Sequence, residues 1–84
     1  MSGEISEFEI IFSPTARKQL AALDSSIQTR VKTALIKICK VPPEGDIMKL
    51  TDRPGQFRLR VGDWRIIYRQ LKDARVIEIV AILR

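Results

Sequence analysis

The stretch FRLRVGDWRIIYR, residues 57–69, alternates apolar and polar residues on both sides of a Gly-Asp pair. Such alternation predicts two half-buried strands, and two strands separated by two residues predict a β-hairpin. Gly62 at the first of the two turn positions favours a type II′ turn. A two-residue turn sets Val61 opposite Trp64, and this pair determines the register of the whole hairpin.

This register predicts the two faces of the hairpin, because side chains alternate across a sheet. One face carries six apolar residues: Phe57, Leu59, Val61, Trp64, Ile66 and Tyr68. The other face carries Arg58, Arg60, Arg65, Ile67 and Arg69. The apolar face needs cover from helices. Trp64 and Tyr68 are therefore expected in the core, although aromatic side chains can also stack on nucleobases.

Two arginines, Arg60 and Arg65, face each other directly in this register. Like charges in opposite positions destabilise a sheet, and an ordinary solvated face, which is the alternative interpretation, would more often mix the two signs. A bound polyanion would relieve the repulsion, because guanidinium groups donate paired hydrogen bonds to phosphates. The pattern thus predicts a surface that binds the phosphates of a polyanion, which Lys49, Arg53 and Arg69 are expected to extend.

The first half of the chain predicts one strand and two helices. Residues 8–12, FEIIF, are β-branched and aromatic, which favours a strand. Ser13, followed by a proline, and Asp24 are typical N-caps. Apolar residues follow each cap at helical spacing, and Pro42 ends the second helix.

The second half predicts a loop and three strands. Residues 41–56 contain three prolines and two glycines and are expected to be mainly loop. Strands are expected at about 56–61, 64–70 and 75–83. The expected fold class is α+β: a two-helix hairpin packed on an antiparallel four-stranded sheet, in the order β-α-α-β-β-β. The length predicts a single domain, residues 1–84.

The last predicted strand has one wholly apolar parity, which is expected to face the core: Ile77, Ile79, Ala81 and Leu83. The other parity ends at Arg84. We expect Arg84 either to join the arginines of the hairpin or to be a frayed terminal residue.

Composition and charge indicate which kinds of partner and site this chain is expected to have. A formal net charge of +5 suggests an anionic partner, most commonly nucleic acid. The chain has no histidine, and its carboxylates show no metal-site spacing, so neither a metal nor a cofactor is expected. The single cysteine, Cys39, is more typical of a packed residue than of a nucleophile, and it favours a cytoplasmic protein. No signal peptide and no membrane-spanning segment is expected.

The run MKLTDRPGQFRLRVGDWRIIYR resembles the central motif of the RelE/ParE toxin superfamily. Its members share the pattern K-L-x(n)-[FY]-[RK]-x-[RK]-x-G-x-[WY]-R-[IV]-x-Y on a β-hairpin, and the order of elements agrees over essentially the whole chain. The resemblance, which we judge RelE-like more than ParE-like, implies the toxin of a type II toxin–antitoxin system, neutralised by a cognate antitoxin.

The resemblance implies one of two activities. RelE-like members cut mRNA in the ribosomal A site without a metal, whereas ParE-like members inhibit DNA gyrase and cut no RNA. For the first activity, catalytic roles fall by position on Arg58, Arg60, Arg65 and Arg84. Arginine stabilises a phosphorane well but is a poor base.

Two departures from the family pattern add a third interpretation. Arg58 and Arg60 stand where some active members have lysine. Active members also usually continue into a short tail with a basic residue and a tyrosine, which this sequence does not show after Arg84. An attenuated toxin that retains antitoxin binding is therefore the further alternative.

Overall fold

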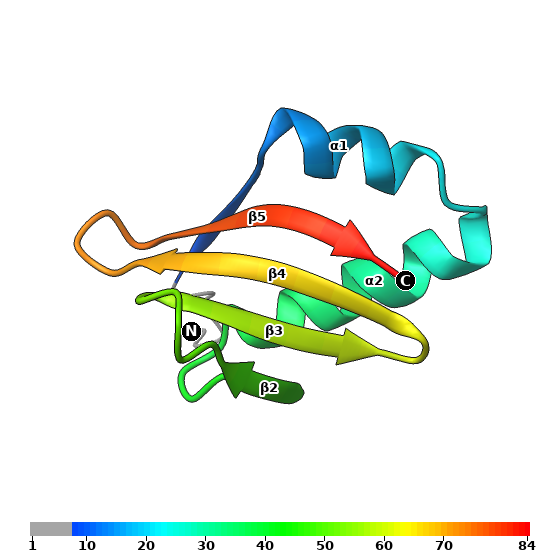
Figure 1. Cartoon of the computed structure of the whole chain (residues 1–84). Coiled ribbons are helices and arrows are strands. Elements are labelled where there is room, and N and C mark those ends of the chain that lie inside the picture. Colours follow the sequence, from blue (N-terminus) through cyan, green and yellow to red (C-terminus); the bar gives the residue numbers. More distant parts are fainter. Residues whose placement is uncertain (1–7) are drawn as a thin grey trace.

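The computed structural model describes residues 8–84 (Figure 1). It contains two helices and five strands, which are β1 (Glu9–Phe12), α1 (Pro14–Ala21), α2 (Ser25–Ile38), β2 (Asp46–Lys49), β3 (Gln56–Val61), β4 (Trp64–Leu71) and β5 (Val76–Leu83). The strands form one sheet in the order β1-β5-β4-β3-β2. The predicted α+β fold, with a helical hairpin on a sheet, is confirmed. Neither helix in this part of the chain is long and apolar enough to cross a membrane.

The sheet differs from the prediction at both edges. The segment Asp46–Lys49, predicted as loop, is a fifth strand that pairs antiparallel with β3. At the other edge β1 pairs with β5 in parallel, so the sheet is mixed rather than wholly antiparallel. Both edge strands have only four residues. Their pairing depends on partners distant in sequence, and a short run alone does not indicate such partners.

Both predicted helix starts are confirmed. The Ser13 hydroxyl accepts a hydrogen bond from the backbone N–H of Ala16 at 3.0 Å, and the Asp24 carboxylate accepts one from Ile27 at 3.1 Å. Each bond satisfies an N–H that has no partner within its helix. The bond from Ile27 also lowers the pKa of Asp24, because it stabilises the charged form.

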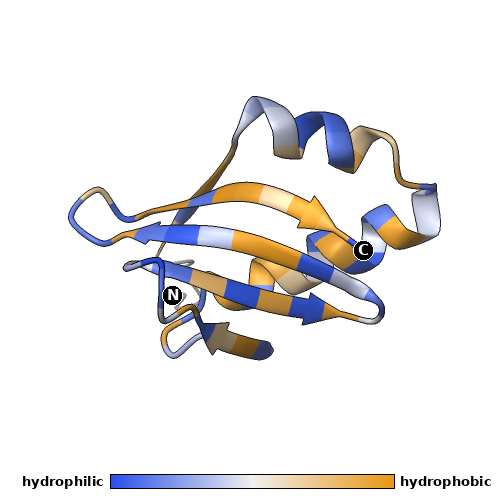
Figure 2. Cartoon of the chain, viewed as in Figure 1, coloured by the Kyte–Doolittle hydropathy of each residue, from blue (hydrophilic) through white to orange (hydrophobic). Residues whose placement is uncertain are grey.

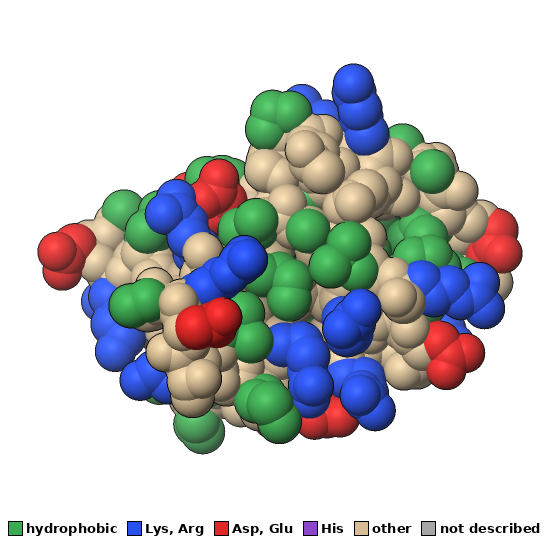
Figure 3. Space-filling model, viewed as in Figure 1, with side chains coloured by type: hydrophobic (Ala, Val, Ile, Leu, Met, Phe, Trp, Pro, Cys, Tyr) green, Lys and Arg blue, Asp and Glu red, His purple; other side chains and the backbone are tan. Residues whose placement is uncertain are grey.

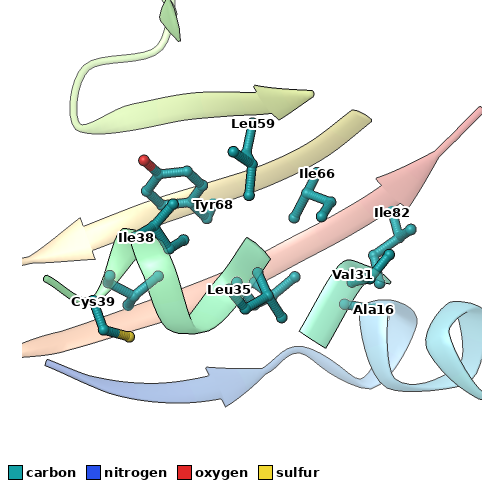
Figure 4. Packing of buried hydrophobic residues seen from close by; sticks show 11 residues of the cluster. Ala16, Val31, Leu35, Ile38, Cys39, Leu59, Ile66, Tyr68 and Ile82 are labelled. Atoms are coloured by element: carbon teal, nitrogen blue, oxygen red, sulfur yellow. The ribbon is translucent and has the colours of Figure 1, made fainter. Parts of the chain in front are cut away.

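The core lies between α2 and the sheet. Figure 1 shows α2 running behind β3, β4 and β5, and Figure 2 shows the alternation of apolar and polar residues along β3 and β4. The buried residues seen in Figure 4 come from α1, α2 and three strands, and include Ala16, Val31, Leu35, Ile38, Leu59, Ile66 and Ile82. Cys39 is buried with them, which raises its pKa, so its predicted packing role is confirmed.

The predicted hairpin register is also confirmed. Gly62 has a φ of +60°, and Val61 pairs with Trp64 across the turn. Arg60 therefore pairs with Arg65, as the alternation predicted. Glycine is favoured at the turn because its φ is in the left-handed region, and the Nη2 atom of Arg30, at the end of a flexible side chain, lies 2.9 Å from where a Cβ would stand.

The predicted face of β5 is right for its first half and wrong for its second. Ile79 pairs with Tyr68, but the next pair joins Ala81 to Ile67, so Val80 is an extra residue on β5. This β-bulge reverses the alternation that follows it. Ile77 and Ile79 are buried as predicted. After the bulge, Ile82 is buried in place of Ala81 and Leu83.

Helix α1 explains how the second half of β5 is held. Strand β1 ends at Phe12, which pairs with Ile79. Beyond this point the Ser13 hydroxyl donates to the carbonyl of Val80 at 2.8 Å, and the Gln19 side-chain oxygen accepts from the N–H of Ile82 at 2.6 Å. Side chains thus satisfy backbone groups that a longer β1 would have paired.

Candidate functional site

The face of the sheet opposite α2 carries the predicted arginines. Figure 3 looks onto this face and shows hydrophobic side chains near its middle with Lys and Arg side chains around them. Arg60 and Arg65 are exposed, and Arg58 is partly buried. None of the three belongs to the buried core cluster, so their predicted position outside the core is confirmed.

Three arginines converge at the tip of the β3–β4 hairpin. A pocket of about 280 Å³, which we call the arginine pocket, is lined by Arg60, Gly62, Asp63, Arg65 and Arg84. The arginines come from β3, β4 and the residue after β5. Within residues 8–84 none of them forms an ion pair with a carboxylate. Their positive charge is therefore available to an anionic ligand.

Arg84 reaches this pocket from the side of the core. Its guanidinium carbon lies 5.5 Å from the centre of the Trp64 ring, within the range of a cation–π contact. Its main-chain oxygen accepts a long hydrogen bond from Arg65 Nη2, at 3.4 Å. The structure thus joins Arg84 to the arginines, although the bulge in β5 reverses the parity on which the expectation was based.

Arg58 lies next to the pocket residues along β3, opposite Ile67 of β4 and Met48 of β2. Its Nε atom is buried and has no hydrogen-bond partner within the part of the chain that the structure describes. An unsatisfied buried donor costs about 1–3 kcal/mol. A ligand oxygen beside Arg58 would remove this cost, which makes Arg58 a second candidate for anion binding on this face.

The other predicted binding residues lie elsewhere. Arg69 forms an ion pair with Glu78, with Nη2 and Oε1 at 2.6 Å. Lys49 pairs with Phe57 and so shares the helix-covered side of the sheet, where it lines a pocket of about 660 Å³ at the end away from Gly62. Arg53 lies exposed between β2 and β3. The structure brings none of these three to the arginine pocket.

Sequence reasoning did not single out Arg30, which lies at the hairpin tip. Arg30 lines a pocket of about 390 Å³ that adjoins the arginine pocket, since Asp63 and Arg84 line both. Its position three residues after Ile27 puts it at the border of the apolar stripe of α2. The sequence shows that a positively charged residue lies at this border. It does not show that Arg30 approaches Gly62, because the two residues are more than 30 positions apart along the chain.

The arginine pocket is suited to binding and stabilising negative charge. Its guanidinium groups donate hydrogen bonds and have no acceptor atom. The chain has no histidine, and burial raises the pKa of its single tyrosine, Tyr68, to about 12. Over residues 8–84 no three His, Cys, Asp or Glu side chains are grouped so that they could hold a metal ion.

Solved structures of toxins share this fold. The chain is similar to RelE in the intact E. coli RelBE toxin–antitoxin complex, with a TM-score of 0.76 and 16% identity over 92% of this chain and 95% of the other. It is similar to RelE in the archaeal RelE-RelB complex from Pyrococcus horikoshii OT3, with a TM-score of 0.77 and 24% identity over 92% and 93%. The YoeB dimer from Staphylococcus aureus matches with a TM-score of 0.74 and 21% identity over 93% and 97%.

The sequence comparison identifies the family. A comparison with curated protein sequences found no significant match. The family described as ParE toxin of type II toxin-antitoxin system, parDE, matches residues 10–84, which include both helices and all of the sheet except Glu9. This chain therefore belongs to the ParE toxin family of type II toxin–antitoxin systems, within the RelE/ParE superfamily that its hairpin motif indicated.

Proposed function

We propose that this toxin is a ribosome-dependent mRNA endoribonuclease that binds RNA in the arginine pocket, needs no metal and acts in the cytoplasm. One observation carries the proposal: Arg60, Arg65 and Arg84, from three different strand ends, line one pocket without a carboxylate partner in the described chain. Three fixed positive charges in one pocket suit the phosphates of a nucleic acid. Arg58 extends the site along β3 with a buried, unpaired donor.

The proposed reaction divides the work between the arginines and their surroundings. Attack of a 2′-oxygen on the adjacent phosphorus breaks the bond to the 5′-oxygen and leaves a cyclic phosphate. Arg60 and Arg65 would hold the non-bridging oxygens and stabilise the charge that grows on them. The proton leaves the 2′-hydroxyl and another reaches the 5′-oxygen. Arginine is a poor acceptor for the first of these protons, so we assign proton transfer to solvent or to the ribosome.

Inhibition of DNA gyrase is the second candidate function. Two observations favour it. The pocket residues include no histidine, the side chain that most often transfers protons in enzymes, and the family whose model matches is that of the ParE toxins. In this case the arginine face would bind a protein and cut no RNA. The third candidate is an attenuated toxin, which binds its antitoxin but neither cuts RNA nor inhibits gyrase.

We also propose a cognate antitoxin as a partner. The RelE relatives from E. coli and Pyrococcus horikoshii were crystallised in complexes with RelB. Exposed apolar side chains lie among the arginines of this face, namely Ile11 (46% exposed), Met48 (52%) and Leu83 (40%). An amphipathic antitoxin segment with acidic residues would match both features. Neutralisation should then protect Arg60 and Arg65 from solvent or distort their positions.

Two assays on the same purified toxin test these functions. Ribosomes carrying a defined mRNA are incubated with the toxin and the new 5′ ends are mapped, while DNA gyrase is assayed separately for supercoiling. The main proposal expects cleavage of mRNA on the ribosome and unchanged gyrase. Inhibited supercoiling without new RNA ends would replace it with the ParE-type function, and no effect in either assay would leave the attenuated toxin.

A further inference from the structure

A second pocket at the hairpin tip shares two residues with the arginine pocket. We call it the tryptophan pocket. It has a volume of about 390 Å³ and lies where the α1–α2 connection meets the β3–β4 turn; its polar and aromatic lining is Asp24, Arg30, Asp63, Trp64 and Arg84. Asp63 and Arg84 line both pockets. A nucleotide with its phosphate in one pocket is therefore within reach of the other with its base.

Trp64 makes one wall of the tryptophan pocket suitable for a planar ligand. Unlike the buried Tyr68, Trp64 is only partly buried at the edge of the core. The Arg84 guanidinium lies over its ring at 5.5 Å. Nucleobases stack on aromatic rings and on guanidinium planes alike. A volume of this size is also within the range of about 300–1,000 Å³ for small-ligand pockets.

The charged groups of the tryptophan pocket discriminate among bases. The Asp63 carboxylate has no hydrogen-bond or ion-pair partner in residues 8–84, whereas Asp24 already accepts bonds from Ser26 and Ile27. A free carboxylate accepts two parallel bonds. Guanine offers such a pair, N1–H and its exocyclic amine, and it also presents the O6 and N7 acceptors that arginine binds. Adenine, cytosine and uracil each lack the paired donors.

We infer that the tryptophan pocket is a guanine-binding subsite for the RNA whose phosphate occupies the arginine pocket. The base stacks on the Arg84 guanidinium that lies over the Trp64 ring, Asp63 accepts from its two adjacent N–H donors, and Arg30 donates to O6. Arg30 reaches this position because it lies against Gly62 at the turn. This inference rests on the proposed function for RNA as the ligand and adds a base preference next to the cleavage site.

The single tryptophan of the chain gives a direct readout. Labelled RNAs 5′-UUGUU-3′, 5′-UUAUU-3′ and 5′-UUUUU-3′ are titrated with the toxin by fluorescence anisotropy, and Trp64 emission is followed with the unlabelled RNAs. We expect the guanosine-containing RNA to bind at least about tenfold more tightly than the other two. It alone should quench Trp64 strongly, because a base held in this pocket lies beside the indole that lines it and changes the position of the Arg84 guanidinium over the ring. Free GMP, titrated in parallel, distinguishes a base read within RNA from a free nucleotide ligand.

Two matched variants locate the preference. Asp63→Asn should abolish the tenfold preference while all three RNAs bind slightly more tightly, since one negative charge beside the arginines is lost. Asp73→Asn removes an exposed carboxylate from the β4–β5 turn, at the other end of β4, and should change neither the preference nor the quenching. Melting temperatures of both variants should match that of the unmodified toxin.

The failures of the subsite and of the proposed function are distinguishable. Equal binding of the three RNAs, or a guanine preference that persists in Asp63→Asn, would overturn the subsite and leave RNA binding in the arginine pocket standing. A preference without quenching of Trp64 would overturn it as well. Tight binding of GMP with no preference among the RNAs would make the ligand a free nucleotide instead. If no RNA bound even at low salt, the subsite would fail, and the proposed function would fail with it only if the ribosome assay also gave no new 5′ ends.

Discussion

Strand β4 contains the same two residue types twice, an aromatic residue followed by arginine, four residues apart. Tyr68 is 3% exposed and stacks on Phe57, with ring centres 5.4 Å apart. Arg69, after it, is paired with Glu78. Trp64 is only partly buried, beneath the Arg84 guanidinium, and the arginine that follows it has no acidic partner in the described chain.

The difference comes from the neighbouring strands and not from the residues themselves. In β5, Arg69 is opposite a glutamate, whereas Arg65 is opposite Leu83. In β3, Arg65 is opposite another arginine, Arg60. The pair Tyr68–Arg69 is therefore held within the fold. The pair Trp64–Arg65 remains accessible to a ligand at the hairpin tip. Two similar aromatic–arginine pairs thus acquire different roles through their cross-strand partners.

The largest expected difference is in stability. Tyr68→Ala should lower the free energy of unfolding by about 3–5 kcal/mol, because it removes a buried ring and leaves a cavity. Trp64→Ala should cost clearly less, since its ring already meets an open pocket. Urea denaturation followed by circular dichroism measures both. Equal losses would show that Trp64 is as much a core residue as Tyr68.

The next difference is in activity. Arg65→Ala should lower single-turnover cleavage of ribosome-bound mRNA by at least about 100-fold, because it removes a donor to the charged transition state. Its stability should change by no more than about 0.5 kcal/mol, since repulsion from Arg60 is lost with the side chain. Arg69→Ala is the matched control and should keep its activity. Loss of stability with unchanged activity in Arg65→Ala would make Arg65 a structural residue.

A pH titration separates the two aromatic residues. Burial raises the pKa of Tyr68 to about 12 from an ordinary value near 10. The folded state therefore keeps the phenol proton after the unfolded state has lost it, so this contribution to stability is complete below about pH 10 and is lost as pH rises toward 12. The loss should be about 1 kcal/mol per pH unit in this window.

The control for this titration is Tyr68→Phe, which has no phenol to ionise. Thermal melts between pH 9 and pH 11 should fall less steeply for this variant than for the unmodified toxin. The same slope in both proteins would mean that other groups, such as lysines, cause the loss, and that the Tyr68 hydroxyl is already accessible to solvent in the fold.

The smallest expected effect comes from giving Arg65 the partner that Arg69 has. Leu83→Glu places a carboxylate opposite Arg65, and Leu83 is exposed enough to tolerate the change. Stability should rise by less than about 1 kcal/mol, as for other exposed pairs. RNA binding should weaken, with its salt dependence reduced by about one ion. Leu83→Gln is the uncharged control, and identical salt slopes for the two variants would place Arg65 outside the RNA contact.

Much of the central hairpin could be predicted from its own residues. Alternation, a glycine at the turn and the two-residue loop are local signals, and they led to the observed pairing of Arg60 with Arg65 and to an arginine-bearing face outside the core. The caps at Ser13 and Asp24 were equally local. The superfamily was also evident, because its motif lies in this same hairpin.

The sequence by itself therefore determined the elements with local signals: both helices, the hairpin and its two faces. Only the tertiary structure decided the parallel pairing of β1, the short strand β2, the bulge at Val80 and the place of Arg84. The reason is that a bulge depends on partners far along the chain, here the Ser13 hydroxyl that bonds to Val80, and one extra residue exchanges the two faces of every position after it. Alternation thus led to the right arginines but to the wrong side for Arg84, because the bulge turns this residue toward Trp64, and it lines the arginine pocket from there.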